Sequence, residues 1–131
     1  MGLARIPMVV LTAVTFMGCA PSKIRSARHD EAGLSNVEAT YTLYLSCMKK
    51  MADVYKDSKS EAWEIAEAAD VKCSGDWFPM YERALYSYLD TGYLSPMQLQ
   101  EHVRVRAAEG RKGAKRVVIQ HVVESRLPAS P

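Results

Sequence analysis

The sequence lacks a strong excess of charge of either sign. Its 131 residues carry 17 Lys and Arg against 15 Asp and Glu, which gives a formal net charge of +2. A charge so close to zero argues against a protein that binds nucleic acid or another polyanion by bulk electrostatic attraction. The composition, 48% hydrophobic and 24% charged, is that of a globular chain, so full disorder and collagen-like structure are excluded.

Recognisable catalytic and metal-binding motifs are also missing. The sequence has no Gly-rich phosphate loop after a strand, no nucleophile elbow and no zinc-protease histidine pair. Its histidines, His29, His102 and His121, lie far apart along the chain. Catalysis needs a positioned nucleophile or acid–base pair, and the sequence shows no pattern that indicates one. We therefore expect a protein that is not an enzyme and that uses no metal or other cofactor.

Long apolar runs are absent except at the N-terminus, where Ile6 to Met17 follow Arg5. A run of about a dozen residues is too short to cross a bilayer, which needs roughly 20 residues. It has the length of the hydrophobic region of a secretory signal. The run ends at Gly18 and Cys19, the first of only three cysteines. An uncleaved N-terminal anchor with an incidental thiol remains the alternative.

The residues Phe16-Met17-Gly18-Cys19 resemble the lipobox of bacterial lipoproteins, with Gly18 as the small residue before the cleavage point. The resemblance implies that residues 1–18 are a signal peptide and that Cys19 carries a lipid anchor in the cell outer membrane, because Ala20 rather than Asp follows it. The domain would then face the periplasm. Residues 19–36 have few large apolar side chains and are expected to form a flexible tether.

The remaining sequence predicts a helical domain over residues 37–127 and a frayed tail over 128–131. Capping-box pairs mark a first helix from about 36 to 57 and a second from about 59 to 74. Apolar residues recur on one face of the first helix at spacings of three and four: Val37, Tyr41, Tyr44, Met48, Met51 and Tyr55. The second helix has an alanine-rich face, which favours close packing: Ala62, Ile65, Ala66, Ala69 and Cys73.

A disulfide between Cys47 and Cys73 follows from this hairpin. Lipid would take Cys19, and the other two cysteines would lie in an oxidising compartment where disulfides persist. The predicted turn lies near residue 60, the midpoint between the two cysteines. In the folded hairpin their positions along the helix axes would therefore differ by only about 3 Å. Such a bond would stabilise the fold by about 3.5 kcal/mol on the chain-entropy model. Two unpaired core cysteines are the alternative, and a zinc site would need more ligands than these.

Two further helices are predicted over 78–89 and 96–109, each with proline in its first turn. Gly110 and Gly113 are expected to interrupt the chain. The valine-rich segment 117–127 fits a last helix or a short strand, and helix is favoured because no partner strand is visible. The expected fold is therefore all-α: a small bundle of four or five short helices that begins with a disulfide-stapled hairpin.

Aromatic residues supply the candidate binding surface. Trp77, Tyr81 and Tyr88 lie on the third predicted helix or just before it. The groove expected between the hairpin and the helix 78–89 could accept an amphipathic helix of another envelope protein. At helical spacing such residues more often belong to the core. The function predicted on this basis is a non-catalytic, lipid-anchored binding module that resembles, in general plan only, the pilot proteins of secretion systems. A protective or inhibitory lipoprotein and a self-associating structural component are the alternatives.

A basic cluster precedes the C-terminus, whereas acidic residues predominate in the predicted hairpin. Its members are Arg104, Arg106, Arg111, Lys112, Lys115 and Arg116. Three interpretations stay open: ion pairs with the acidic hairpin of the same or a neighbouring molecule, contact with an anionic lipid surface, and nucleic-acid binding. The last is disfavoured because no aromatic residue is interleaved with the basic ones.

Overall fold

A computed structural model describes residues 22–128 and contains no strand within them. The helices are α1 (Ser22–Tyr55), α2 (Ala62–Ser74), α3 (Phe78–Leu89) and α4 (Pro96–Arg126). The all-α fold expected from the sequence is confirmed. The predicted signal peptide over 1–18, the predicted anchor residue Cys19 and the last residues of the tail, 129–131, lie outside the described residues.

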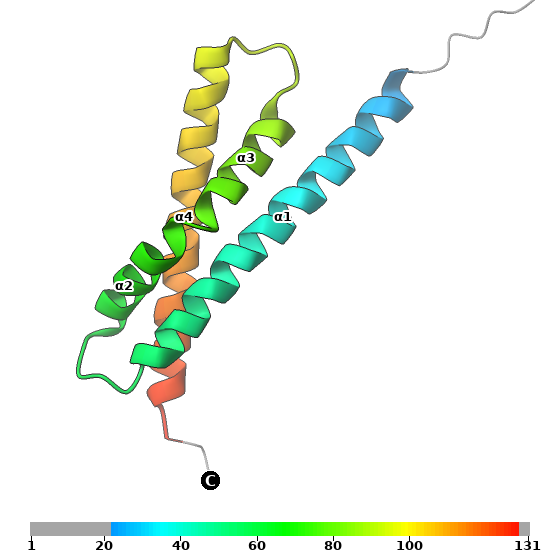
Figure 1. The fold of residues 1–131 in the computed structure, drawn as a ribbon. Coiled ribbons are helices and arrows are strands. Elements are labelled where there is room, and N and C mark those ends of the chain that lie inside the picture. Colours follow the sequence, from blue (N-terminus) through cyan, green and yellow to red (C-terminus); the bar gives the residue numbers. More distant parts are fainter. Residues whose placement is uncertain (1–21, 129–131) are drawn as a thin grey trace, which may run out of the picture.

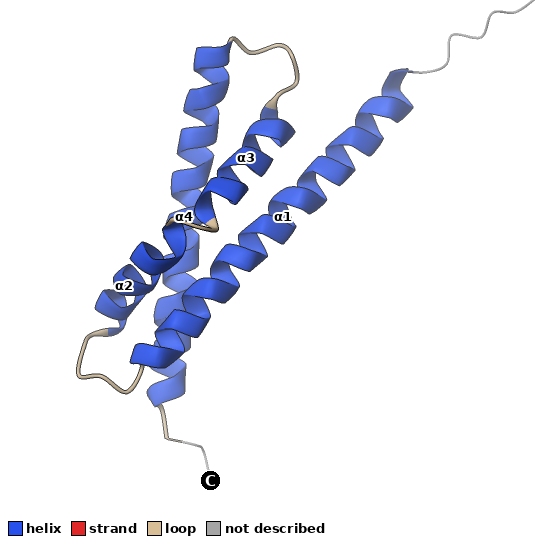
Figure 2. Ribbon diagram, in the orientation of Figure 1, coloured by secondary structure: helices blue, strands red, loops and turns tan. Residues whose placement is uncertain are grey.

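The helices form three antiparallel arms (Figure 1). The first arm is α1. The second is α2 followed by α3, which run back along α1 end to end, and the third is α4, which runs in the same direction as α1. Short loops join the arms, and the α2–α3 junction breaks the middle arm (Figure 2). Because α2 and α3 both pack against α1 and α4, one core runs along the whole bundle.

The first helix is longer than predicted, because it begins at Ser22 rather than near residue 36. Residues 22–36, expected to be flexible, are helical. They are rich in helix-forming Lys, Arg, Ala and Glu and hold no proline. Gly33 lies against α3: a Cβ there would come within 3.1 Å of Tyr88 Cδ2. The glycine thus permits a close approach of α1 and α3 instead of ending the helix.

The last helix is continuous, so the predicted break at Gly110 and Gly113 is wrong. Both glycines lie inside α4, where tyrosine side chains of other helices reach the backbone. A Cβ at Gly110 would lie 2.9 Å from Tyr81 Cε1, and one at Gly113 would lie 3.5 Å from Tyr41 Oη. The glycines make room for packing. The helical interpretation of 117–127 is confirmed up to Arg126.

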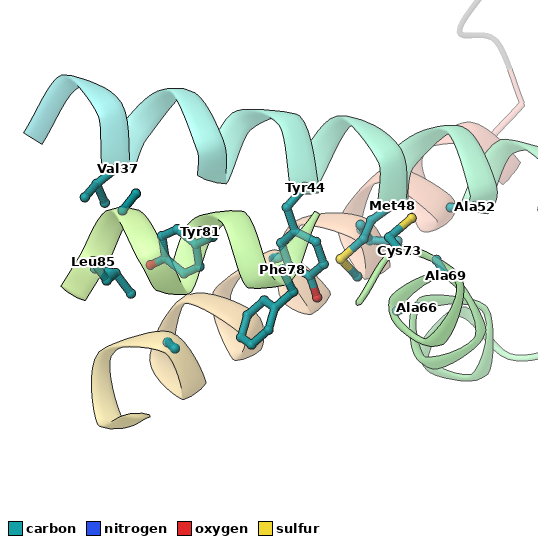
Figure 3. Close-up of a cluster of buried hydrophobic side chains, with 14 of the residues drawn as sticks. Val37, Tyr44, Met48, Ala52, Ala66, Ala69, Cys73, Phe78, Tyr81 and Leu85 are labelled. Carbon is teal, nitrogen blue, oxygen red and sulfur yellow. The ribbon is translucent and has the colours of Figure 1, made fainter. Parts of the chain in front are cut away.

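The buried core follows the predicted apolar faces (Figure 3). Tyr44 and Met48 of α1, together with Ile65 and Cys73 of α2, are fully buried or nearly so. Phe78 of α3 packs its ring 5.3 Å from the ring of Tyr44. The faces deduced from spacing therefore point inward as expected.

The predicted disulfide between Cys47 and Cys73 is confirmed. Its Cα atoms are 6.0 Å apart, within the range that a disulfide spans. The second helix starts three residues later than predicted, at Ala62, with Glu61 and Glu64 forming its capping box.

Arg126, at the end of α4, binds the loop between α1 and α2. Its guanidinium donates hydrogen bonds to the carbonyl oxygens of Lys56, Ser58 and Ser60 at 2.7, 3.0 and 3.0 Å. These carbonyls belong to the loop between α1 and α2, so one side chain provides hydrogen-bond donors for three backbone carbonyl oxygens of this loop.

Candidate functional site

A single carboxylate is buried where α1, α2 and α4 meet. Asp70 of α2 is 1% exposed. Arg111 of α4 donates to its two oxygens at 3.0 and 2.7 Å, and Lys115 Nζ lies 3.2 Å from one of them. Tyr44 of α1 donates its hydroxyl to the same carboxylate, as does Ser74 at 3.0 Å. This set is called the Asp70 cluster below.

The Asp70 cluster fixes the charge state of its members. Burial by itself would raise the pKa of Asp70, but the hydrogen bonds donated by its four partners, Tyr44 first, hold that pKa below its ordinary value. Burial, and then the hydrogen bond to Asp70, raise the pKa of Tyr44 far above its ordinary value. The hydrogen bond to Asp70 raises the pKa of Arg111. The carboxylate thus stays charged and the phenol stays neutral at any pH near 7.

The geometry of the Asp70 cluster is suited to holding helices together. Each donor is already paired, and among the described residues no buried side-chain nitrogen or oxygen lacks a hydrogen-bond partner. The Arg111 guanidinium also lies 5.3 Å over the ring of Phe78, which ties α4 to the start of α3. Sequence reasoning missed this cluster. The available signal was an aspartate beside Ala69, close to the alanine-rich buried face.

The best candidate for a binding site is a shallow groove between α1 and the α2–α3 junction, called the Trp77 groove below. Its volume is about 200 Å³, and it is lined by Leu43, Ser46, Cys47, Lys50, Met51 and Trp77. Most of this lining is apolar or sulfur-bearing, with Lys50 as its only charged residue. It can accept an apolar side chain, with a carboxylate at the rim beside the ammonium group.

The predicted aromatic residues separate into two groups. Trp77 lines this groove, whereas Tyr81 is buried in the core, with its ring 5.4 Å from the ring of Tyr41. Tyr88 is partly buried and lies against Gly33. Of the three residues, the structure therefore places only Trp77 in an open groove, and Tyr81 has the core position that was the alternative.

A second groove, between α3 and α4, was not foreseen from the sequence. It has a volume of about 490 Å³ and is lined by Pro79, Glu82, Arg83, Tyr86, Gln100, Val103 and Arg104. Its walls are mainly exposed and carry charges of both signs. Its residues come from two helices, and the sequence pattern alone does not show which sides of these helices face each other.

The basic residues of α4 do not form one continuous patch. Arg111 pairs with Asp70, and Lys115 pairs with Glu67 at 2.7 Å, so pairing with the acidic hairpin is confirmed for these two. Two further pairs are local to α4: Arg104 lies 2.6 Å from Glu101, and Arg106 lies 3.5 Å from Glu109. A third joins two helices, since His121 of α4 lies 2.8 Å from Asp53 of α1.

The exposed members Lys112 and Arg116 are the two that form no ion pair within residues 22–128. Contact of the basic residues with an anionic surface stays a prediction.

In the described part of the chain, no group of three or more His, Cys, Asp or Glu side chains could hold a metal ion. Over the same residues, none of the helices combines the length and the apolar character needed to cross a bilayer. Comparison of the chain with protein-family models, curated proteins and solved structures yields no match. The residues and their geometry therefore carry the functional proposal.

Proposed function

We propose that this chain is a bacterial lipoprotein, anchored in the outer membrane through Cys19, whose helical domain is a non-catalytic module that binds another envelope protein. The observation that carries the proposal is the use of the cysteines. Cys47 and Cys73 are joined, which leaves Cys19, the residue that follows the short apolar run, as the single remaining thiol of the sequence. A structural disulfide also suits an oxidising compartment such as the periplasm.

The Trp77 groove supports the binding part of the proposal. Leu43, at one wall of the groove, is 44% exposed, and the disulfide that borders the groove holds α1 and α2 in fixed positions. A preformed apolar groove loses little conformational entropy when a partner binds. Its chemistry suits an amphipathic helix that inserts one apolar side chain near Trp77 and places an acidic residue near Lys50.

The anchor is tested by mass spectrometry of the protein extracted from bacterial membranes with detergent. We expect a new N-terminus at Cys19 with the mass of attached acyl chains. A Cys19→Ala variant should keep its N-terminal segment and lose the acyl mass. An intact N-terminus on the unchanged protein, with no acyl mass on Cys19, would contradict the proposal.

The binding site is tested by placing a photo-crosslinking amino acid at Leu43 in the anchored protein in cells. The matched control is Val54, which lies on the same helix, is 68% exposed and lines none of the described grooves. We expect one discrete crosslinked envelope protein from Leu43 and none from Val54. Equal crosslinking at the two positions would show that the groove is not the docking site, and a dimer of this chain would identify self-association instead.

A further inference from the structure

The loop between α3 and α4 ends the bundle with exposed apolar side chains. Tyr93 is 93% exposed and Met97 is 80% exposed. No charged residue occurs from Thr91 to Gln100, and Gly92 makes the turn with a φ of +76°, a conformation that glycine adopts without steric cost. Residues 91–97 are called the tip below. An uncharged tip that exposes a tyrosine and a methionine suits a membrane interface, where an aromatic ring is buried while its hydroxyl stays hydrated.

The tip lies at the same end of the bundle as the start of α1 (Figure 1). The hydroxyl of Tyr41 on α1 lies beside Gly113 of α4, which places these two residues at about the same height along the bundle. From that height α1 extends about 28 Å back to Ser22, and α4 extends about 25 Å back to Pro96, at 1.5 Å per residue. The two helix starts therefore differ by only about 3 Å along the bundle.

We infer that the tip rests on the bilayer that carries the lipid anchor, with Tyr93 and Met97 inserted at the boundary between headgroups and acyl chains. The inference rests on the proposed function, because acylation of Cys19 is what brings a bilayer to this end. Cys19 precedes Ser22 by three residues, which span at most about 10 Å. That reach exceeds the difference between the two helix starts, so the anchor and the tip can contact one surface together.

Two inserted side chains are too few to hold a domain on a membrane by themselves. Because the anchor keeps the tip next to the bilayer, the effective concentration of the tip at the membrane is high. A weak contact by the two side chains is then sufficient. The contact then sets the orientation of the domain. With the tip on the membrane, the α1–α2 loop faces away from it, and Leu43 in the Trp77 groove lies roughly 30 Å along α1 from Ser22. A partner protein would bind at that height above the surface.

The test uses tryptophan fluorescence of the full acylated protein reconstituted into vesicles of phosphatidylethanolamine and phosphatidylglycerol, with or without bromine on the acyl chains. The reporter variant is Tyr93→Trp, and the matched control is Leu127→Trp. Leu127 is 64% exposed and follows the opposite end of α4. Trp63 and Trp77 are replaced by Phe in both variants. Circular dichroism and thiol titration verify that each variant keeps its helices and its disulfide.

Interfacial side chains lie roughly 5–10 Å deep, so we expect brominated lipid to reduce the emission of Tyr93→Trp about two-fold. The emission of Leu127→Trp should stay unchanged. The mass of the Cys19 peptide is measured on the same sample. If Cys19 is acylated and Tyr93→Trp is quenched no more than Leu127→Trp, the tip is not the end that rests on the bilayer and this inference alone is overturned. If Cys19 is unmodified, the proposed lipoprotein and the inference are both overturned.

Discussion

Asp70 has an effect on stability that reaches beyond its size, because three helices supply the donors to its carboxylate. Loss of one donor leaves a buried charge with fewer partners, which is costly in the interior of a protein. The guanidinium of Arg111 donates to both carboxylate oxygens and to the hydroxyl of Ser74 at 3.1 Å, so its loss removes several hydrogen bonds of the cluster at once. Its substitution is therefore the sharpest test of the cluster.

We predict that Arg111→Met lowers the free energy of unfolding by about 2–3 kcal/mol, measured by urea denaturation. The matched control is Arg104→Met, which removes an exposed pair with Glu101 on one helix and should cost less than about 1 kcal/mol. Equal effects of the two substitutions would mean that the Asp70 cluster adds nothing beyond a surface ion pair.

The lowered pKa of Asp70 also predicts a dependence of stability on pH. When the pKa of a carboxyl is lower in the folded state, the unfolded state takes up the proton first as the pH falls. The stabilisation by Asp70 is therefore complete above the ordinary carboxyl pKa of about 3.9 and is lost as the pH falls through the lower folded value. Urea midpoints should decline below about pH 4, and Asp70→Asn should decline less steeply. Parallel declines would refute the assignment.

At the scale of the helices, the two glycines of α4 have different roles. A Cβ at Gly110 would lie within 3.0 Å of several atoms of the buried Tyr81 ring, whereas a Cβ at Gly113 would make an ordinary contact of 3.5 Å with Tyr41 Oη. The first position therefore depends on the absence of a side chain and the second does not. Alanine at the two positions therefore distinguishes the effect of packing on stability from the effect of helix propensity.

We predict that Gly113→Ala raises the free energy of unfolding by about 0.5–1 kcal/mol, because alanine favours the helix. Gly110→Ala should instead lower it by about 1–3 kcal/mol, because Tyr81 must move out of a well-packed position. Thermal and urea denaturation of both variants would measure the two signs. Stabilisation by Gly110→Ala would show that the Tyr81 side chain can move away without loss of packing energy.

The helices were predictable where a repeated apolar face coincides with a local start signal. The start of α4 has both, since Pro96 lies in its first turn as expected and Ser95 and Gln98 form a capping box before it. The prediction was wrong where a tertiary contact overrides a local preference. Gly110 was expected to end a helix, but the packing of Tyr81 against it cannot be read from neighbouring residues. The early start of α1 was missed because residues 22–36 have helix propensity without an apolar face.

The candidate site was predictable only in part. The groove was expected between the hairpin and the helix 78–89, whereas the groove that Trp77 lines is formed by α1 and contains no residue of α3. Tyr81 carries the same spacing signal but lies in the core, since the choice between groove and interior depends on which helix covers it. Asp70 and Arg111 are far apart in the sequence, and no local pattern pairs a carboxylate of one helix with a guanidinium of another.

At the scale of the whole molecule, the disulfide between Cys47 and Cys73 supplies stability that a core of this size needs. We predict that the double substitution Cys47→Ser and Cys73→Ser lowers the free energy of unfolding by about 3 kcal/mol, measured by urea denaturation. The protein should stay folded at 25 °C, because the Asp70 cluster still joins the same helices. Reductant should destabilise the unchanged protein by a similar amount and leave the double variant unaffected. A reductant-insensitive midpoint of the unchanged protein would contradict the prediction.

The position of the disulfide also decides how tension would pass through the molecule. If a partner pulled at the Trp77 groove while the lipid anchor held the other end, force would run along α1 to Cys47, cross the covalent bond to Cys73 and reach Trp77 within one helical turn. The amide of Trp77 donates to the carbonyl of Cys73 at 3.2 Å, so this last step is short and stiff. Of the segment between the two cysteines, residues 52–72 line no part of the groove and lie off this path. A load between membrane and partner would therefore leave the α1–α2 hairpin unstretched.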